Sequence, residues 1–269
     1  MTFLDDAMSR TTALAQKQLW INLRRYRDPE VTFSDAGVSV FSQDDEDGKI
    51  LYLLARRTRR VPDLFVDIGA GDCVHFSNCS NLAIHHGWYG LFVDAEAKYI
   101  EFGQEFYTHN VLTWLTPPAF CVETVTPDNV NQVIEKAGFS GNIGLLSIDV
   151  DGADYWIWKA LSVVQPAVVV IECRTCWGLV NAVVPYGANQ ETGGYYGASL
   201  PAMCELAGRK GYELAGVSRS GINAFFFDPG MVDAEEVTDR NVLGFSFPKP
   251  RGPRGHPFYT LEGMRFEEG

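Results

Sequence analysis

The sequence predicts an α/β protein with a doubly wound sheet in three layers, in which most strands are parallel and a terminal hairpin is antiparallel. Short apolar runs alternate with stretches of helical periodicity beyond residue 48. A glycine-rich turn follows one of the first runs, and only residues 218–221 separate the last two. With 269 residues and 46% hydrophobic content the chain can fill one sizeable core, so we expect a single domain over 1–269.

The N-terminal part, 1–48, is expected to form a helical cap followed by an entry loop. Residues 5–26 repeat apolar side chains at helical spacing. The acidic run Asp44 to Asp47 precedes an apolar stripe at 50–54, and its charge suits the positive end of a helix dipole. The basic cluster at 56–60 is expected to be a solvated helix end.

The core, 49–228, is predicted to alternate strands and helices. The expected strands lie at 64–68, 90–93, 119–123, 144–149, 167–171, 212–217 and 223–227, and the expected helices at 82–86, 97–107, 127–137, 155–161 and 199–209. An insertion at 177–197 is too long for an ordinary connection, so we expect a substrate lid with candidate contacts Tyr186, Tyr195 and Tyr196. Residues 229–269 lack periodicity and are expected to form a surface tail.

The first strand ends in a glycine turn. Gly69 and Gly71 lack a Cβ, so the backbone there can adopt unusual dihedral angles and approach a ligand closely. The next strand ends in Asp94, 25 residues after Gly69, where a carboxylate can accept hydrogen bonds from both hydroxyls of a ribose. This spacing predicts a nucleoside site. Its candidate residues are Asp67, Gly69, Ala70, Gly71 and Asp94.

The residues around the turn favour a cationic ligand over a dinucleotide. A nicotinamide dinucleotide usually requires a third glycine, which lets a helix N-terminus face the pyrophosphate, and Cys73 stands there instead. Asp67 and Asp72 would repel a pyrophosphate but suit the sulfonium and amino groups of S-adenosylmethionine. The charge therefore favours a methyl donor as the cofactor.

Carboxylates also follow the fourth and fifth strands, as Asp149, Asp151 and Glu172. Because α/β proteins bind ligands at the carboxyl ends of their strands, we expect these side chains to share one sheet edge. Asp149 can hold the donor's ammonium group or orient a substrate, and Asp151 can act as a general base. The three can bind a divalent cation through oxygen, or bind substrate hydroxyls and take a proton. The alternative is that Asp149 and Asp151 are only turn and helix-cap residues.

Two histidines are further candidate bases. His75 lies just after the glycine turn and is better placed than His109, although a structural role is the alternative for each. Cys173 and Cys176 have the Cys-x-x-Cys spacing, but no second pair completes a zinc site. We therefore expect the six scattered cysteines to pack as small apolar groups.

Several segments resemble a known family. They are Ser42 to Gly48 (SQDDEDG), Val66 to Asp72, Leu91 to Asp94, Leu146 to Gly152 (LSIDVDG), Tyr195 to Leu200 and Gly221 to Phe227. Through them the chain resembles the Rossmann-like S-adenosylmethionine-dependent methyltransferases, and among these the FkbM-like small-molecule methyltransferases. The resemblance extends over roughly residues 40–228.

The resemblance implies a methyltransferase sheet with an antiparallel terminal hairpin and an N-terminal segment that covers the cofactor. It makes Ser42 and Gln43 candidate contacts to cofactor or substrate, the alternative being a polar loop that leads into a helix. It also places Glu123 and Thr124, at the end of the third strand, beside the adenine.

Charge and composition disfavour other classes of partner. The 22 Lys and Arg against 34 Asp and Glu give a net charge of −12, so we expect no nucleic-acid partner. No apolar run is long enough to cross a bilayer and no signal segment is visible, so we expect no membrane partner and a cytoplasmic protein. A homo-oligomer that uses the tail is left open.

The expected reaction is an in-line displacement, in which an oxygen or nitrogen of a sugar, a natural-product intermediate or a similar small molecule attacks the sulfonium methyl group. Three alternatives stay open. The same donor could serve another alkyl transfer or a cyclisation, or the protein could be a noncatalytic adenosyl-ligand sensor. A nicotinamide-dependent oxidoreductase is the weaker option, because Cys73 and the terminal hairpin disfavour it.

Overall fold

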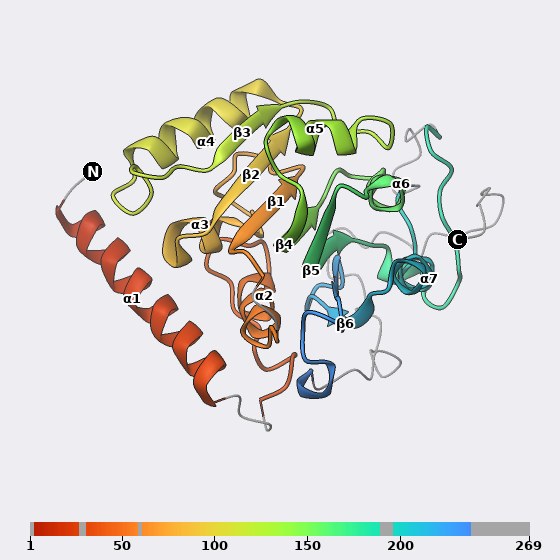
Figure 1. Cartoon of the computed structure of the whole chain (residues 1–269), viewed down its shortest axis with the longest axis horizontal. Helices are drawn as coiled ribbons and strands as arrows, with labels where there is room; N and C mark the ends of the chain where they lie inside the picture. Colours follow the sequence, from red (N-terminus) through yellow and green to blue (C-terminus); the bar gives the residue numbers. More distant parts are fainter. Residues whose placement is uncertain (1–2, 27–30, 59–60, 189–195, 238–269) are drawn as a thin grey trace, which may run out of the picture.

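The computed structural model describes residues 3–26, 31–58, 61–188 and 196–237, and it confirms the predicted α/β class. One seven-stranded sheet has the order β3-β2-β1-β4-β5-β7-β6 (Figure 1). Its strands are β1 (Leu64–Ile68), β2 (Tyr89–Asp94), β3 (Ala119–Val122), β4 (Gly141–Ile148), β5 (Val164–Glu172), β6 (Glu213–Val217) and β7 (Asn223–Phe227). The first five strands are parallel, and β7 is antiparallel to both β5 and β6.

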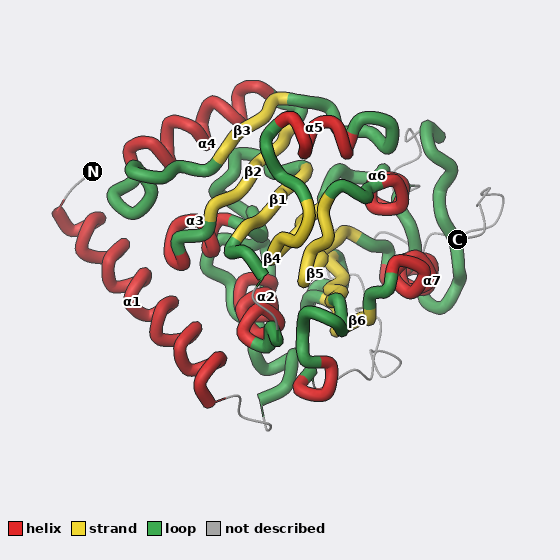
Figure 2. Tube along the Cα trace, viewed as in Figure 1, coloured by secondary structure: helices red, strands yellow, loops and turns green. Residues whose placement is uncertain are grey.

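Helices cover both faces of the sheet and give the predicted three layers (Figure 2). One face carries α2 (Glu46–Ala55), α3 (Ser80–His86) and α4 (Ala97–His109), and the other carries α5 (Val130–Lys136), α6 (Asp154–Ala160) and α7 (Leu200–Lys210). Alternate residues of β5 enter the two cores, with Val168 on one side and Val169 on the other. This explains why the central strands are apolar throughout.

The expected N-terminal helix is α1 (Phe3–Tyr26), which lies outside α2 and α3 (Figure 1). The Trp20 ring packs edge-on against His86 of α3, with 5.7 Å between ring centroids. Gln16 Oε1 accepts a hydrogen bond from Asn81 Nδ2 at 3.1 Å. None of the helices in the described part of the chain combines the length and apolar character needed to span a bilayer.

The beginning of the expected surface tail is part of the core. Met231, Val232 and Val237 are buried in the cluster beneath α2, and Val232 forms an isolated bridge with Arg57. The prediction of a surface segment is therefore wrong for 229–237. Three isolated apolar residues form no periodic pattern, so the sequence alone did not indicate that they are buried. Residues 238–269 lie outside the described residues.

The basic cluster at the end of α2 is not solvated as expected. The Arg56 guanidinium stacks on the Tyr52 ring at 3.3 Å from its centroid, and the residue is buried. Arg57 lies over Trp88 and pairs with Asp63 at 2.9 Å. Both side chains cover aromatic surface with a planar cation, a mode of packing that a charge pattern alone does not reveal.

Candidate functional site

A cavity of about 710 Å³ opens at the carboxyl ends of the parallel strands. Loops that follow β1, β2, β3 and β4 form its wall, together with Gln43 and Tyr186. This is the place where a doubly wound sheet binds ligands, because the loops diverge around the point where the strand order reverses. Among the described side chains of α1, residues 10–25, none lines the cavity, so this part of the helix does not cover it.

The glycine turn is shaped by two different constraints. Gly69 has φ of +80°, and a Cβ there would collide with the carbonyl oxygen of Asp149. Gly71 has φ of +54° and open space around it, so only its left-handed backbone favours glycine. Its N–H donates a hydrogen bond of 2.8 Å to Asp94 Oδ2. The turn after β1 is therefore tied directly to the acidic end of β2.

Cys73, in the position of the missing third glycine, is fully buried and also has a left-handed backbone, with φ of +64°. Its side chain faces Gly103 of α4, where any Cβ would come within 3.0 Å of the Cys73 Cβ. The Cys73 carbonyl accepts hydrogen bonds from Ser80 Oγ and Tyr107 Oη at 2.7 and 2.9 Å. The glycine that permits close packing is thus on the facing helix, and α3 begins only at Ser80.

Asp94 has a fixed orientation at the end of β2. Besides the bond from Gly71, its Oδ1 accepts the Glu96 N–H at 2.8 Å. An ionised carboxylate has about four acceptor positions, so two remain for a ligand. Asp94, Glu123 and Thr124 all line the cavity.

Asp67 lies buried beneath the glycine turn, at the floor of the cavity. Its Oδ2 accepts a hydrogen bond from Ser77 Oγ at 2.9 Å. Burial raises the pKa of Asp67 to about 6. Asn78 donates to Ser147 Oγ at 3.2 Å in the same wall. Ser77 and Asn78 were not among the predicted site residues, because their partners become visible only when the loop after β1 folds back over the sheet.

His75 and Asp72 form a pair at the mouth of the cavity. His75 Nδ1 is 2.7 Å from Asp72 Oδ2, and 67% of the His75 side chain is exposed. Partial burial acts to raise the pKa of Asp72, but hydrogen bonds from His75 and Val74 lower it overall. Asp72 therefore orients the His75 ring through this contact. His109 is not part of the site, since it ends α4 and its Nδ1 bonds to the Glu105 carbonyl.

Asp149, Asp151 and Glu172 meet at the ends of β4 and β5, and we call them the strand-end cluster. One carboxylate oxygen from each lies within 4.8 Å of the other two. Burial, with the charges of Asp154 and Asp151, raises the pKa of Asp149 to about 7. Burial and neighbouring carboxylates likewise raise the pKa of Glu172 to about 9. The Arg174 guanidinium, 3.8 Å away, acts in the opposite direction but does not outweigh them.

The turn that carries Asp151 is held from below by Asp154, which accepts the N–H groups of Val150 and Gly152 at 2.9 Å each. Asp154 is the first residue of α6, so the turn is tied directly to this helix. Asp151 itself has a left-handed backbone, with φ of +53°. Such conformations are uncommon in residues other than glycine, and they concentrate at functional sites.

Aromatic side chains form the rim of the cavity. Phe76, Tyr99 and Tyr186 line it and are 72, 40 and 50% exposed. Phe76 has φ of +63°, and its N–H donates to the Phe41 carbonyl at 2.8 Å. The sequence analysis predicted Tyr186 but missed Phe76 and Tyr99, because nothing in the local pattern distinguishes an exposed aromatic residue from a core residue.

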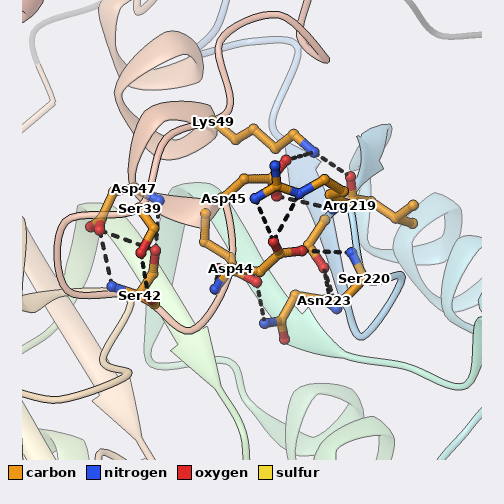
Figure 3. Close-up of polar contacts among 12 residues, drawn as sticks. Ser39, Ser42, Asp44, Asp45, Asp47, Lys49, Arg219, Ser220 and Asn223 are labelled. Atoms are coloured by element: carbon orange, nitrogen blue, oxygen red, sulfur yellow. Dashed lines mark hydrogen bonds and ion pairs between the residues drawn. The ribbon is translucent and has the colours of Figure 1, made fainter. Parts of the chain in front are cut away.

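The acidic loop, residues 44–47, connects the start of α2 to the turn between β6 and β7 (Figure 3). Asp44 Oδ1 accepts from the Arg219 guanidinium at 2.8 Å, and its Oδ2 accepts the Ser220 N–H. Asp45 accepts the Arg219 N–H and pairs with Lys49 at 2.9 Å. These carboxylates already have protein donors, so the loop does not need a metal.

Asp47 supports the segment before Gln43. Its Oδ2 accepts the N–H groups of Val40, Phe41 and Ser42 at 2.7, 2.7 and 3.0 Å (Figure 3). Ser42 forms a bridge with Phe76 and is buried. Of the two candidate contacts, Gln43 lines the cavity, whereas Ser42 bonds to Asp47 beneath it.

The remaining candidate residues lie outside the cavity wall or outside the described residues. Glu172 belongs to the strand-end cluster but does not line the cavity. Tyr196 does not line it either, and its ring centroid is 3.4 Å from the Arg174 guanidinium carbon. Tyr195 and residues 189–195 of the expected lid lie outside the described residues. Cys173 is buried and Cys176 exposed, and neither joins a metal-ligating group among the described side chains.

No protein-family model matches this chain, and no curated protein matches it. Similar solved structures include TnmH, at 16% identity over 62% of this chain and a TM-score of 0.38. Magnesium protoporphyrin IX methyltransferase (ChlM) from Synechocystis PCC 6803 with bound SAM has 13% identity, covers 78% of this chain and 94% of its own, and gives a TM-score of 0.42. Spermidine synthase from Thermotoga maritima has 14% identity, 79% and 69% coverage, and a TM-score of 0.41. The chain matches 50% of the TnmH chain.

Proposed function

We propose that this protein transfers a methyl group from S-adenosylmethionine to an oxygen or nitrogen of a small molecule. The observation that carries the proposal is one cavity that joins Asp94, hydrogen-bonded to the glycine turn, with Asp67 and Asp149. Asp94 is placed to accept both ribose hydroxyls, and Glu123 and Thr124 to border the adenine. Asp67 supplies negative charge for the ammonium and sulfonium end of the donor, which leaves Asp149 for the acceptor.

The same geometry disfavours a dinucleotide. Pyrophosphate recognition uses helix N–H groups directly after the glycine turn, but here α3 begins at Ser80, beyond a loop with two left-handed residues, Cys73 and Phe76. Asp72 in that loop and Asp67 at the end of β1 add negative charge there. Strand β7 is antiparallel within the sheet, which resembles methyltransferases rather than the all-parallel dinucleotide-binding arrangement.

In the proposed reaction the acceptor atom donates its electron pair to the methyl carbon while the carbon–sulfur bond breaks and its pair stays on sulfur. The products are the methylated acceptor and S-adenosylhomocysteine. Because the leaving group starts as a cation, catalysis depends on alignment and on removal of the acceptor's proton. Asp149 is the candidate base, since it faces the cavity and accepts no hydrogen bond from any described residue.

A divalent cation would suit the oxygen donors of the strand-end cluster in chemical kind, as Mg²⁺ or Ca²⁺ prefers carboxylates. If bound, it would polarise an acceptor hydroxyl and assist its ionisation. The Arg174 guanidinium, 3.8 Å from Glu172, already brings a positive charge to this cluster. A metal is therefore tested as an added component.

The first test is calorimetric titration with S-adenosylmethionine, S-adenosylhomocysteine and NAD. We expect both adenosyl ligands to bind, and Asp94→Ala to weaken them at least about tenfold because two ribose hydrogen bonds are lost. Asp128→Ala, an exposed carboxylate outside the cavity wall, is the matched control. Asp94→Asn guards against a folding defect, which circular dichroism would detect. Failure of the native protein to bind either adenosyl ligand refutes the proposal.

A further inference from the structure

The cavity wall carries charge of one sign. Its six carboxylates belong to Asp67, Asp72, Asp94, Glu123, Asp149 and Asp151, and no Lys or Arg occurs among the described lining residues. Asp72 Oδ2 lies 2.7 Å from His75 Nδ1, and backbone N–H groups stabilise Asp94. A methyl donor with a sulfonium, an ammonium and a carboxylate adds one net positive charge. The cavity therefore keeps an excess of negative charge beside the place where an acceptor must sit.

The rim adds a second, independent feature. Phe76, Tyr99 and Tyr186 expose aromatic surface at the cavity, and Phe76 does so from a left-handed backbone. A left-handed backbone and an exposed aromatic ring both destabilise the folded state, and such features concentrate at binding sites. Aromatic faces together with carboxylates are the groups that proteins use to bind organic ammonium ions.

We propose that the methyl acceptor is a protonated amine bearing an apolar or aromatic group, bound between the strand-end cluster and the aromatic rim and methylated on nitrogen. This inference rests on the proposed methyl transfer and names its substrate class. An anionic acceptor is disfavoured because it would face six carboxylates in the cavity wall. The cation at the strand-end cluster, Arg174, pairs with Glu172, and neither of the two lines the cavity.

The chemistry balances without a further reagent. The bound ammonium gives one proton to the Asp149 carboxylate, which leaves a neutral amine with a free electron pair. That pair forms the nitrogen–carbon bond as the carbon–sulfur bond breaks, and the sulfur keeps its electrons. The products are a methylammonium ion, S-adenosylhomocysteine and a protonated Asp149, which returns its proton to solvent.

The test uses protein saturated with S-adenosylhomocysteine and three probes with one skeleton, 2-phenylethylamine, 2-phenylethanol and phenylacetate. We expect calorimetry to show the amine binding at least about tenfold more tightly than the alcohol, and the acid not binding, because the wall attracts cations. Saturation with S-adenosylhomocysteine is measured first, so a failure of the proposed function is seen separately. Labelled S-adenosylmethionine should then give an N-methyl product by mass spectrometry.

Two variants assign the effect to the strand-end cluster. Asp151→Asn, which tolerates the left-handed backbone, should weaken the amine at least about fivefold and leave the alcohol unchanged. Glu135→Gln removes a charge from the exposed side of α5 and should leave the affinities for the amine and the alcohol unchanged. Binding of the alcohol or the acid as tightly as the amine, or no amine binding at all, overturns the inference. So does Mg²⁺ making the alcohol the tighter ligand, which would assign the cluster to a metal.

Discussion

The acidic loop and the strand-end cluster are both groups of neighbouring carboxylates, and they differ in what surrounds their oxygens. Each carboxylate at 44–47 accepts a hydrogen bond from the protein. Asp149 accepts none from the described residues, yet it is partly buried beside Asp151 and Glu172. A buried charge without donors is costly, so its retention at a cavity indicates a role in binding or catalysis. Sequence pattern alone does not separate the two groups.

The largest expected effect comes from Asp149→Asn. Without a base, methyl transfer to an acceptor that the native enzyme turns over should fall by about 10² to 10⁴-fold. Binding of S-adenosylhomocysteine should stay within about threefold, because Asp67 and Asp94 are unchanged. Calorimetry and single-turnover kinetics measure the two quantities. Activity within about tenfold of the native enzyme would contradict the role as base, and lost cofactor binding would instead make Asp149 a ligand of the donor's ammonium.

Asp47→Ala should show the opposite behaviour, with a loss of stability. Three backbone N–H groups and the Ser42 hydroxyl lose their acceptor, so we expect the free energy of unfolding to fall by about 3 kcal/mol. Urea unfolding measures this loss, and Asp47→Asn, which keeps a side-chain oxygen, should lose less. A loss under about 1 kcal/mol for the alanine variant would show that water replaces the carboxylate.

The pH dependence sharpens the contrast further. Since the pKa of Asp149 is raised to about 7, kcat/KM should rise about tenfold per pH unit below 7 and level off above it. For stability the sign is reversed: the contribution of Asp149 is complete below its ordinary pKa near 4 and is lost as pH rises through about 7. In Asp149→Asn, the free energy of unfolding should therefore fall less between these pH values than in the native protein, as measured by urea unfolding. An identical pH slope in both proteins would contradict the assignment.

The smallest effect should come from Arg219→Ala, at the edge of the acidic loop. The guanidinium is 74% exposed, so its pair with Asp44 is screened by solvent. The backbone N–H groups of Arg219 and Ser220 still reach Asp45 and Asp44 after the change. We expect a loss clearly below that of Asp47→Ala, which shrinks further in high salt. A loss equal to that of Asp47→Ala would mean that the side chain, not the backbone, holds the loop.

The fold was predictable because its signals are local. The apolar strands, the left-handed Gly69 and the acidic end of β2 each depend on a few neighbouring residues, and the observed elements differ from the predicted ones by a few residues at their ends. The cavity followed from the same signals, since parallel strands bring Asp94 and Asp149 to one edge.

What sequence reasoning missed depends on partners that are distant along the chain. The donors to Asp44 lie 175 and 176 residues away, and Gly103, which accommodates Cys73, lies on another helix. Met231 and Val232 are buried because α2 and the sheet leave space for them, which periodicity does not reveal. Exposure of Phe76 likewise results from tertiary pairing with Phe41.

The contact between Glu46 and Asn223 joins residues 177 positions apart, and this has a consequence for synthesis. At a translation rate of about 5–20 residues per second, roughly 10–35 s pass between the synthesis of the acidic loop and that of its partners. During that interval water solvates its carboxylates. A loop held by apolar contacts would instead expose hydrophobic surface and be prone to aggregate. The loop next to Gln43 thus gains its partners from the hairpin of β6 and β7 only late in synthesis.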